Sequence, residues 1–251
     1  MEEIIKGKEV IAYKGMGFDM TCKGFHYELG KSYKTYKAEL CEIGFHACLN
    51  PIDVLEYYPK YYSSRYFKVL LSGEFAKCGM WDTNVAATEI TILEEIPSDK
   101  FLTNTEWWKN EIVLDLLYYS DGLARIRNWD KQYNFINKQG ELLSEKWFEK
   151  AFDFNEGFAV VEKTIGLRNF IGKKGKILSD EWFNNAHSFH DGLAKVQRRD
   201  GLWNFINKKG NYLIDEWFNY LDDFFRDGFA KVQRTNGECC KIAKSGKLYK
   251  D

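Results

Sequence analysis

Aromatic and basic side chains gather in one short segment of the sequence. Tyr57 and Tyr58 are followed by Pro59, by a Lys-Tyr-Tyr triplet at 60–62 and by Arg65. Aromatic rings beside Lys and Arg suit stacking on a planar, anionic molecule such as a nucleotide. The same pattern also fits the end of a helix that covers a sheet. Tyr57, Tyr58 and Arg65 are therefore candidate ligand-binding residues, and structural packing is the alternative.

His46 and Cys48 are of the residue types that support nucleophilic catalysis. They alternate on one face of a predicted strand, whereas a nucleophile and its base normally come from separate elements and need a third, orienting group. A packed, hydrogen-bonded histidine is therefore the favoured interpretation. The cysteines in the first part of the chain are Cys22, Cys41, Cys48 and Cys78. No CxxC pair, which structural zinc sites usually contain, is present, so we predict free thiols and no metal.

The composition excludes several classes of function. The 251 residues include 36 Lys and Arg against 37 Asp and Glu, a balance that disfavours general nucleic-acid binding. No apolar run approaches the roughly 18–20 residues that span a bilayer, and the first ten residues lack the apolar stretch of a secretory signal. We expect a cytoplasmic protein without a membrane partner. The common catalytic and phosphate-loop motifs are absent, which favours binding over catalysis and predicts no cofactor.

An internal repeat of 35 residues organises the second half of the chain. Glycines of Asp-Gly or Glu-Gly pairs recur at Gly122, Gly157, Gly192 and Gly228, and the triplet Asn-Phe-Ile starts at 134, 169 and 204. Each unit contains two alternating runs that read as strands, joined or followed by turns. A third short strand is expected over 140–144, and Ser144 and Ser179 are expected to cap a helical turn. Since one such unit cannot bury its own aromatic face, the repeated Trp-Phe pairs should pack between neighbouring units.

The sequence segments DGLAKV, NFINKKG and EWF are similar to motifs of the WG-repeat family of bacterial proteins, and the resemblance covers residues 118–251. The Trp-Gly dipeptide that names the family is absent from this chain. The resemblance implies a β-rich repeat array without established catalysis. We therefore predict an N-terminal domain over 1–98, a degenerate capping repeat over 99–121 and WG-type repeats over 122–251, in a mainly β chain whose N-terminal domain is α+β.

The N-terminal part reads as several strands and one short helix. Strand-like runs occupy 10–15, 66–75 and 87–95. The helix should begin after Asn50, a suitable N-cap, with Pro51 at its first position. The sequence over 10–95 resembles a module of uncharacterised function in phage and prophage proteins, which implies a phage origin and no particular chemistry.

A weaker resemblance relates the same part to ADP-ribosyltransferases. Tyr13, Lys14 and Gly15 occupy the place of that family's aromatic-Arg-Gly strand, with Lys14 in place of Arg. The GFHAC segment containing His46 occupies the place of its second strand, without the serines, and Glu89 takes the place of the acidic residue. The resemblance implies that Tyr13, Lys14 and His46 surround a pocket.

The sequence favours a non-enzymatic recognition protein that binds a nucleotide-like small molecule or a host protein, in a role that counters host defence. The predicted ligand-binding residues are Tyr13, Lys14, His46, Tyr57, Tyr58 and Arg65. One alternative is an enzyme that uses NAD, with Glu89 at the pocket. Another is a structural adaptor whose repeats dock a protein.

Overall fold

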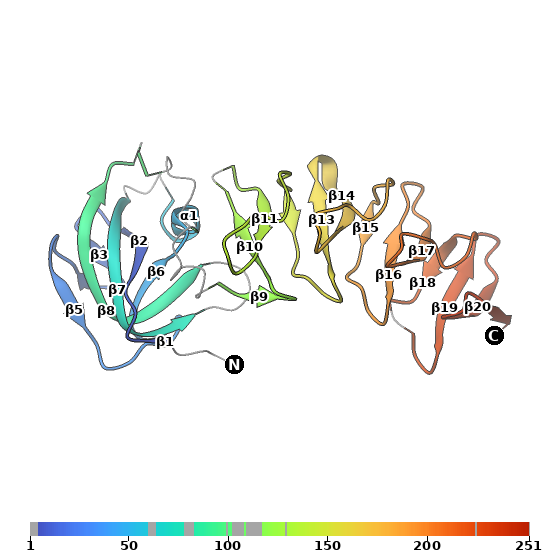
Figure 1. Ribbon diagram of the computed structural model, residues 1–251, viewed down its shortest axis with the longest axis horizontal. Helices are drawn as coiled ribbons and strands as arrows, with labels where there is room; N and C mark the ends of the chain where they lie inside the picture. Colours follow the sequence, from blue (N-terminus) through green and yellow to red (C-terminus); the bar gives the residue numbers. More distant parts are fainter. Residues whose placement is uncertain are drawn as a thin grey trace. The chain divides into compact units, whose positions relative to one another are not determined.

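The computed structural model describes residues 5–59, 64–77, 83–98, 100, 101, 108, 117–128, 130–223 and 225–250. Two compact units make up the chain (Figure 1): the first comprises residues 1–118 with 127–131 and 137–141, and the second comprises 119–126, 132–136 and 142–251. Cys78, the triplet at 60–62 and most of the expected capping repeat over 99–121 lie outside the described residues. Within the described ranges, no helix has the length and apolar character needed to cross a membrane.

Four antiparallel strands of the N-terminal unit close into a ring. The sheet has the order β1-β7-β2-β6-β8-β5, and β7 also pairs with β8. Its strands are β1 (Ile5–Lys6), β2 (Val10–Met16), β5 (Ser32–Lys34), β6 (Phe45–Cys48), β7 (Arg65–Lys77) and β8 (Asn84–Ile96). The two long strands β7 and β8 change register twice, between Lys68 and Val69 and between Ser72 and Phe75, and such bulges bend a strand enough to curl a sheet. The expected strands of this part are confirmed.

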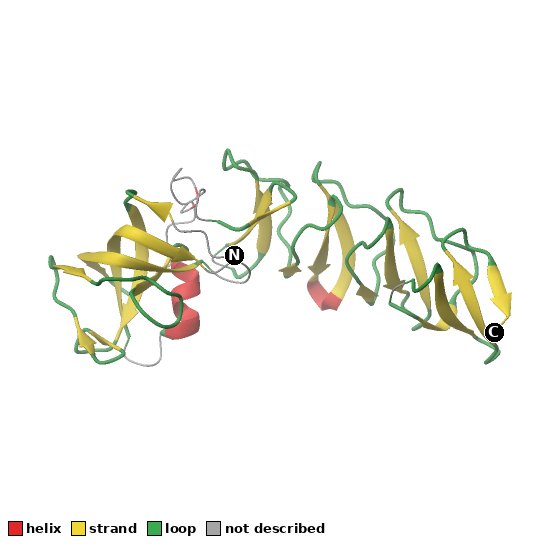
Figure 2. Ribbon diagram, turned by 90° about the horizontal axis from the view of Figure 1, so that it is seen from below, coloured by secondary structure: helices red, strands yellow, loops and turns green. Residues whose placement is uncertain are grey.

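Helix α1 (Pro51–Tyr57) begins where the sequence predicts (Figure 2). The Asn50 side chain accepts a hydrogen bond from the Ile52 N–H at 3.1 Å, and Pro51 occupies the first turn. Ile52 and Val54 are buried, and the helix packs on β2 and β6. The hairpin of β3 (Thr21–Cys22) and β4 (Phe25–His26) forms a two-stranded sheet of its own and does not pair with strands of the main sheet.

The second compact unit is a series of antiparallel hairpins at the spacing of the sequence repeat. Each 35-residue repeat is called a repeat unit below. The hairpins are β10 (Leu123–Arg127) with β11 (Tyr133–Ile136), β13 (Phe158–Lys163) with β14 (Leu167–Gly172), β16 (Leu193–Gln197) with β17 (Trp203–Asn207), and β19 (Phe229–Arg234) with β20 (Cys239–Ala243). A one-turn 3-10 helix (Thr164–Gly166) joins β13 to β14. The shorter strands are β9 (Tyr119–Ser120), β12 (Lys150–Ala151), β15 (Asn185–Ala186), β18 (Phe218–Leu221) and β21 (Leu248–Lys250). The mainly β repeat architecture is confirmed.

Two predictions for the repeats are wrong: the helical turn after Ser144 and Ser179, and the position of the third strand. Ser144 and Ser179 each accept a hydrogen bond from the backbone N–H two residues later, in a bend rather than a helix. The segment expected as a strand over 140–144 makes one isolated bridge, between Ile136 and Leu142, and the third strand follows the Trp-Phe pair instead. The physical reason is that the Phe183 N–H, which a helix would donate to the Ser179 carbonyl, donates instead to the Arg168 carbonyl of the preceding strand at 2.9 Å. Phe148 pairs with Tyr133 in the same way.

One hydrophobic cluster fills each junction between neighbouring units. The first joins Phe135 of one unit to Val161 and Ile171 of the next. Two further clusters repeat this arrangement along the array, centred on Phe170 and Phe205 and again containing Ala, Val and Ile of the following hairpin. The phenylalanines of all three Trp-Phe pairs are buried, and Trp182 and Trp217 pack against the clusters. The expected packing between units is therefore confirmed.

Acidic residues before the repeated glycines link one unit to the next. The Asp121 carboxylate accepts the Gly157 N–H at 2.6 Å. One unit further on, the Glu156 carboxylate accepts the N–H groups of Asp191 and Gly192 at 2.7 and 2.9 Å. Asp121, Glu156 and Asp191 each have a positive φ, between 52° and 55°. Each acidic residue therefore forms a tight turn with the glycine that follows it, and Asp121 and Glu156 also form the link to the next repeat.

Candidate functional site

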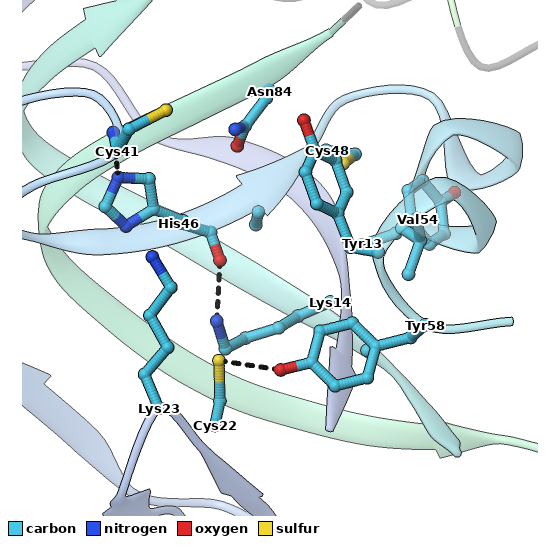
Figure 3. A pocket seen from close by; sticks show the side chains of 13 residues that line it. Tyr13, Lys14, Cys22, Lys23, Cys41, His46, Cys48, Val54, Tyr58 and Asn84 are labelled. Carbon is cyan, nitrogen blue, oxygen red and sulfur yellow. Dashed lines mark hydrogen bonds between the residues drawn. The ribbon is translucent and has the colours of Figure 1, made fainter. Parts of the chain in front are cut away.

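A cavity of about 240 Å³ lies in the N-terminal unit, where β2, β6, the end of α1 and the β3–β4 hairpin meet (Figure 3). Five of the six predicted ligand-binding residues line it: Tyr13, Lys14, His46, Tyr57 and Tyr58. The other lining residues are Gly15, Cys22, Lys23, Cys41, Ala47, Cys48, Val54 and Asn84. Strand and helix segments far apart in the sequence thus bring the candidate residues to one place.

Tyr58 forms one wall of the cavity because residue 15 has no side chain. A Cβ atom on Gly15 would lie 2.4 Å from Cγ of Tyr58, which no real contact allows. The ring therefore rests directly on strand β2, and its hydroxyl donates a hydrogen bond to Sγ of Cys22 at 3.0 Å. The Tyr58 backbone is also held, because its carbonyl accepts the Tyr66 hydroxyl at 2.9 Å. Burial, together with the Cys22 contact, raises the pKa of Tyr58, so its phenol stays protonated at neutral pH.

Lys14 places a buried amine at the cavity. The side chain is 4% exposed, and its Nζ donates to the His46 carbonyl at 2.7 Å and lies 5.3 Å from the centre of the Tyr27 ring. Within the described part of the chain, no carboxylate forms an ion pair with it. Burial lowers the pKa of Lys14, the Cys22 and Cys48 thiols beside the amine act in the opposite direction, and the charge of Lys23 adds a smaller lowering.

His46 is fully engaged by its own loop. Its Nε2 accepts the Cys41 N–H at 2.9 Å, which leaves Nδ1 to carry the proton and to donate to the Gly44 carbonyl at 3.1 Å. Burial lowers the pKa of His46, and the charges of Lys14 and Lys23 lower it further. A neutral imidazole with both nitrogens occupied is not free to act as a base for Cys48, in agreement with the packed histidine that the sequence favours.

The thiols of Cys22, Cys41 and Cys48 line the cavity. Among the described residues, the group of His, Cys, Asp and Glu whose donor atoms approach one another within 4.8 Å lies in the repeat array, at Glu156, His190 and Asp191. The Glu156 carboxylate already accepts two backbone N–H groups and pairs with Lys208 there.

Arg65 and Glu89 lie outside this cavity. The Arg65 guanidinium forms two hydrogen bonds with the Glu95 carboxylate, at 2.6 and 2.8 Å. Glu89 pairs with Lys34 at 2.6 Å and accepts the Ser72 hydroxyl at 3.1 Å. The acidic residue that the ADP-ribosyltransferase resemblance implies is therefore not gathered with Tyr13, Lys14 and His46.

Lys23 is the charged lining residue that the sequence analysis missed. It occupies the turn of the β3–β4 hairpin with φ of 49°, followed by Gly24 with φ of 79°. A residue-Gly pair between two short runs is a hairpin signal, so the turn was detectable. Lys23 reaches the cavity of Lys14 because of the way the hairpin packs on the rest of the domain. A local sequence pattern does not predict that packing.

Two family models match separate parts of the chain. Residues 10–104 match a domain of unknown function (DUF7666). Residues 135–164, 170–203 and 205–239 each match the WG containing repeat. No curated protein matches the sequence.

Several solved structures match part of the chain at low identity and with low TM-scores. The computationally designed Ika8 protein is 15% identical, with a TM-score of 0.32, over 52% of this chain and 46% of that one. BamB from Moraxella catarrhalis is 9% identical, with a TM-score of 0.31, over 53% and 50% of the two chains. The WD40 β propeller domain of Doa1 is 12% identical, with a TM-score of 0.26, over 53% and 61%. The chain thus spans about half the length of Ika8 and BamB.

Proposed function

We propose that this chain is a recognition protein whose N-terminal cavity binds a nucleotide-like small molecule. The combination of a domain of unknown function with three WG containing repeats suggests a binding or adaptor role. One observation carries the proposal: five residues chosen from the sequence as ligand-binding candidates line the same cavity. On the resemblance of residues 10–95 to a module of phage and prophage proteins, we further propose that the protein is phage-encoded and that its ligand is drawn from host signalling.

The size and lining of the cavity favour a small ligand with one ring system. A volume of about 240 Å³ lies below the roughly 300–1,000 Å³ of sites for drug-sized molecules. Tyr13, Tyr57 and Tyr58 offer aromatic faces for a planar ring, and Lys14 and Lys23 offer amines for a polar group. A dinucleotide such as NAD is disfavoured by this volume, and the NAD-using alternative also lacks its carboxylate at the cavity, because Glu89 is paired elsewhere.

A thermal-shift screen of the full chain with linear and cyclic nucleotides, NAD and ADP-ribose tests the proposal. A ligand at 100 times its dissociation constant stabilises the folded state by about 2.7 kcal/mol, which gives a clear shift. Tyr57→Ala, which removes a ring that is 52% exposed, should weaken binding without unfolding the domain. Arg65→Ala is the matched control outside the cavity and should bind as the parent does.

Two results would contradict the proposal. A flat response to the whole panel would favour the adaptor alternative, and a pull-down with the full chain would then be the next experiment. Equal weakening by Tyr57→Ala and Arg65→Ala would place the ligand away from this cavity.

A further inference from the structure

The fixed charges that line the cavity all have the same sign. Lys14 and Lys23 supply amines, whereas none of the described lining residues is Asp or Glu. The remaining lining groups are phenols, thiols, an amide, a neutral imidazole and apolar side chains. An anionic group entering this space would meet two donors of positive charge and no repelling carboxylate.

The Lys14 amine lacks the carboxylate partner that a buried lysine normally has. A buried ammonium is usually paired with a carboxylate, because leaving the charge uncompensated in the interior is costly. Lys14 is 4% exposed, yet its amine meets the neutral His46 carbonyl, the Cys22 thiol and the face of the Tyr27 ring, and no carboxylate of the described residues. An ammonium has three N–H donors, so capacity remains for a ligand oxygen.

Lys23 lines the same cavity as Lys14 and brings a second amine to it. Its charge lowers the pKa of Lys14 and of His46, and Figure 3 shows its Nζ directed toward His46 on the same side as the Lys14 amine. The two amines come from independent elements, strand β2 and the turn of the β3–β4 hairpin. The Tyr58–Cys22 hydrogen bond ties this hairpin to the aromatic wall of the cavity.

We propose that the ligand of this cavity is a small aromatic anion, whose phosphate or carboxylate lies between the amines of Lys14 and Lys23 and whose ring contacts the tyrosines. This inference rests on the proposed function and adds the charge and size class of the ligand. The bound anion supplies the negative charge that no described carboxylate provides to Lys14, so the complex offsets more of the cost of burying the amine than the free protein does.

Calorimetric titration of the full chain with matched pairs of compounds tests this inference. One set of pairs consists of nucleoside 5′-monophosphates and their uncharged nucleosides, and the other of benzoate and benzamide. The anion of at least one pair should bind at least about tenfold more tightly than its uncharged partner, which corresponds to roughly 1.4 kcal/mol. Binding in the first set identifies a phosphate as the group between the amines, and binding in the second identifies a carboxylate.

Variants of Lys14 and Lys23 test whether the two amines cause the preference for an anion over its uncharged partner. Lys14→Met should keep or raise the melting temperature of the free protein, because an apolar side chain of similar length replaces a buried amine that has no carboxylate partner. It should weaken anion binding at least about tenfold. Lys23→Gln, in an exposed turn, should weaken it without affecting folding. Lys31→Gln is the control, since Lys31 is exposed and paired with Glu28 away from the cavity.

The outcomes separate this inference from the proposed function. If uncharged compounds bind as tightly as anions, or if both lysine variants bind the anion like the parent, the inference is wrong while small-molecule recognition stands. If no compound of either kind binds, both are wrong.

Discussion

Asn169 holds the bend of its repeat unit through three hydrogen bonds, and its removal should destabilise the array strongly. The side chain is fully buried. Its Nδ2 donates to the carbonyls of Ser179 and Glu181 at 2.7 and 2.9 Å, and its Oδ1 accepts the Phe170 N–H at 2.7 Å. Asn204 makes the same three contacts one unit later, so the role belongs to the position in the repeat.

The Asn169→Ala substitution leaves three backbone groups without these partners: the Phe170 N–H, which is buried, and the carbonyls of Ser179 and Glu181, which are partly buried. Each unsatisfied buried group costs about 1–3 kcal/mol, and water offsets part of that cost at a partly exposed carbonyl. We therefore expect the free energy of unfolding to fall by about 2–4 kcal/mol. Urea unfolding followed by tryptophan fluorescence measures this, because Trp182 belongs to the same unit and packs on the neighbouring core.

Two further variants control for the chemistry of asparagine. Asn207 also accepts two backbone N–H groups, from Lys209 and Asn211, but in an exposed turn where water can replace it. Asn207→Ala should therefore cost less than about 1 kcal/mol. Cys240 pairs with Val232 as Asn169 pairs with Val161, yet it is followed by strand β21 rather than by a serine bend. Cys240→Asn should destabilise the fold by burying an amide without acceptors. An equal cost for Asn169→Ala and Asn207→Ala, or stabilisation by Cys240→Asn, would refute this reasoning.

Two more predictions concern the cavity. Gly15→Ala should lower the free energy of unfolding by about 1–3 kcal/mol, because its Cβ displaces Tyr58. Gly17→Ala should change it by less than about 0.5 kcal/mol in the same urea assay, because its Cβ meets the exposed Asp19 carboxylate at 3.2 Å and Thr21 oxygens at the ordinary contact distance of 3.5 Å. Stability should also fall as the pH drops below about 6.5, because the unfolded chain protonates His46 before the folded chain does. Urea unfolding over a pH series should show this slope, flattened in His46→Gln; an unchanged slope would contradict the assignment.

The array was predictable because its information is local and repeated. Glycines at positive φ, alternating strand residues and the buried phenylalanine of the Trp-Phe pair recur at the repeat spacing, and each feature acts within a few residues of itself. The start of α1 was predictable for the same reason, since an N-cap and a first-turn proline are adjacent in the chain. The bend after Ser179 was not, because the Phe183 N–H pairs with the Arg168 carbonyl, fifteen residues earlier, instead of with Ser179.

The cavity depended on contacts that no local pattern contains. The sequence by itself determined which residue types were available for a planar anion, and it also nominated Arg65. Only the tertiary structure decided that Tyr58 lies on Gly15, that Lys23 turns toward Lys14, and that Arg65 is held by Glu95 outside the cavity. The physical reason is that strand order and hairpin packing bring residues from separate elements together. Side-chain type and spacing set what chemistry is possible, whereas long-range packing sets which groups meet.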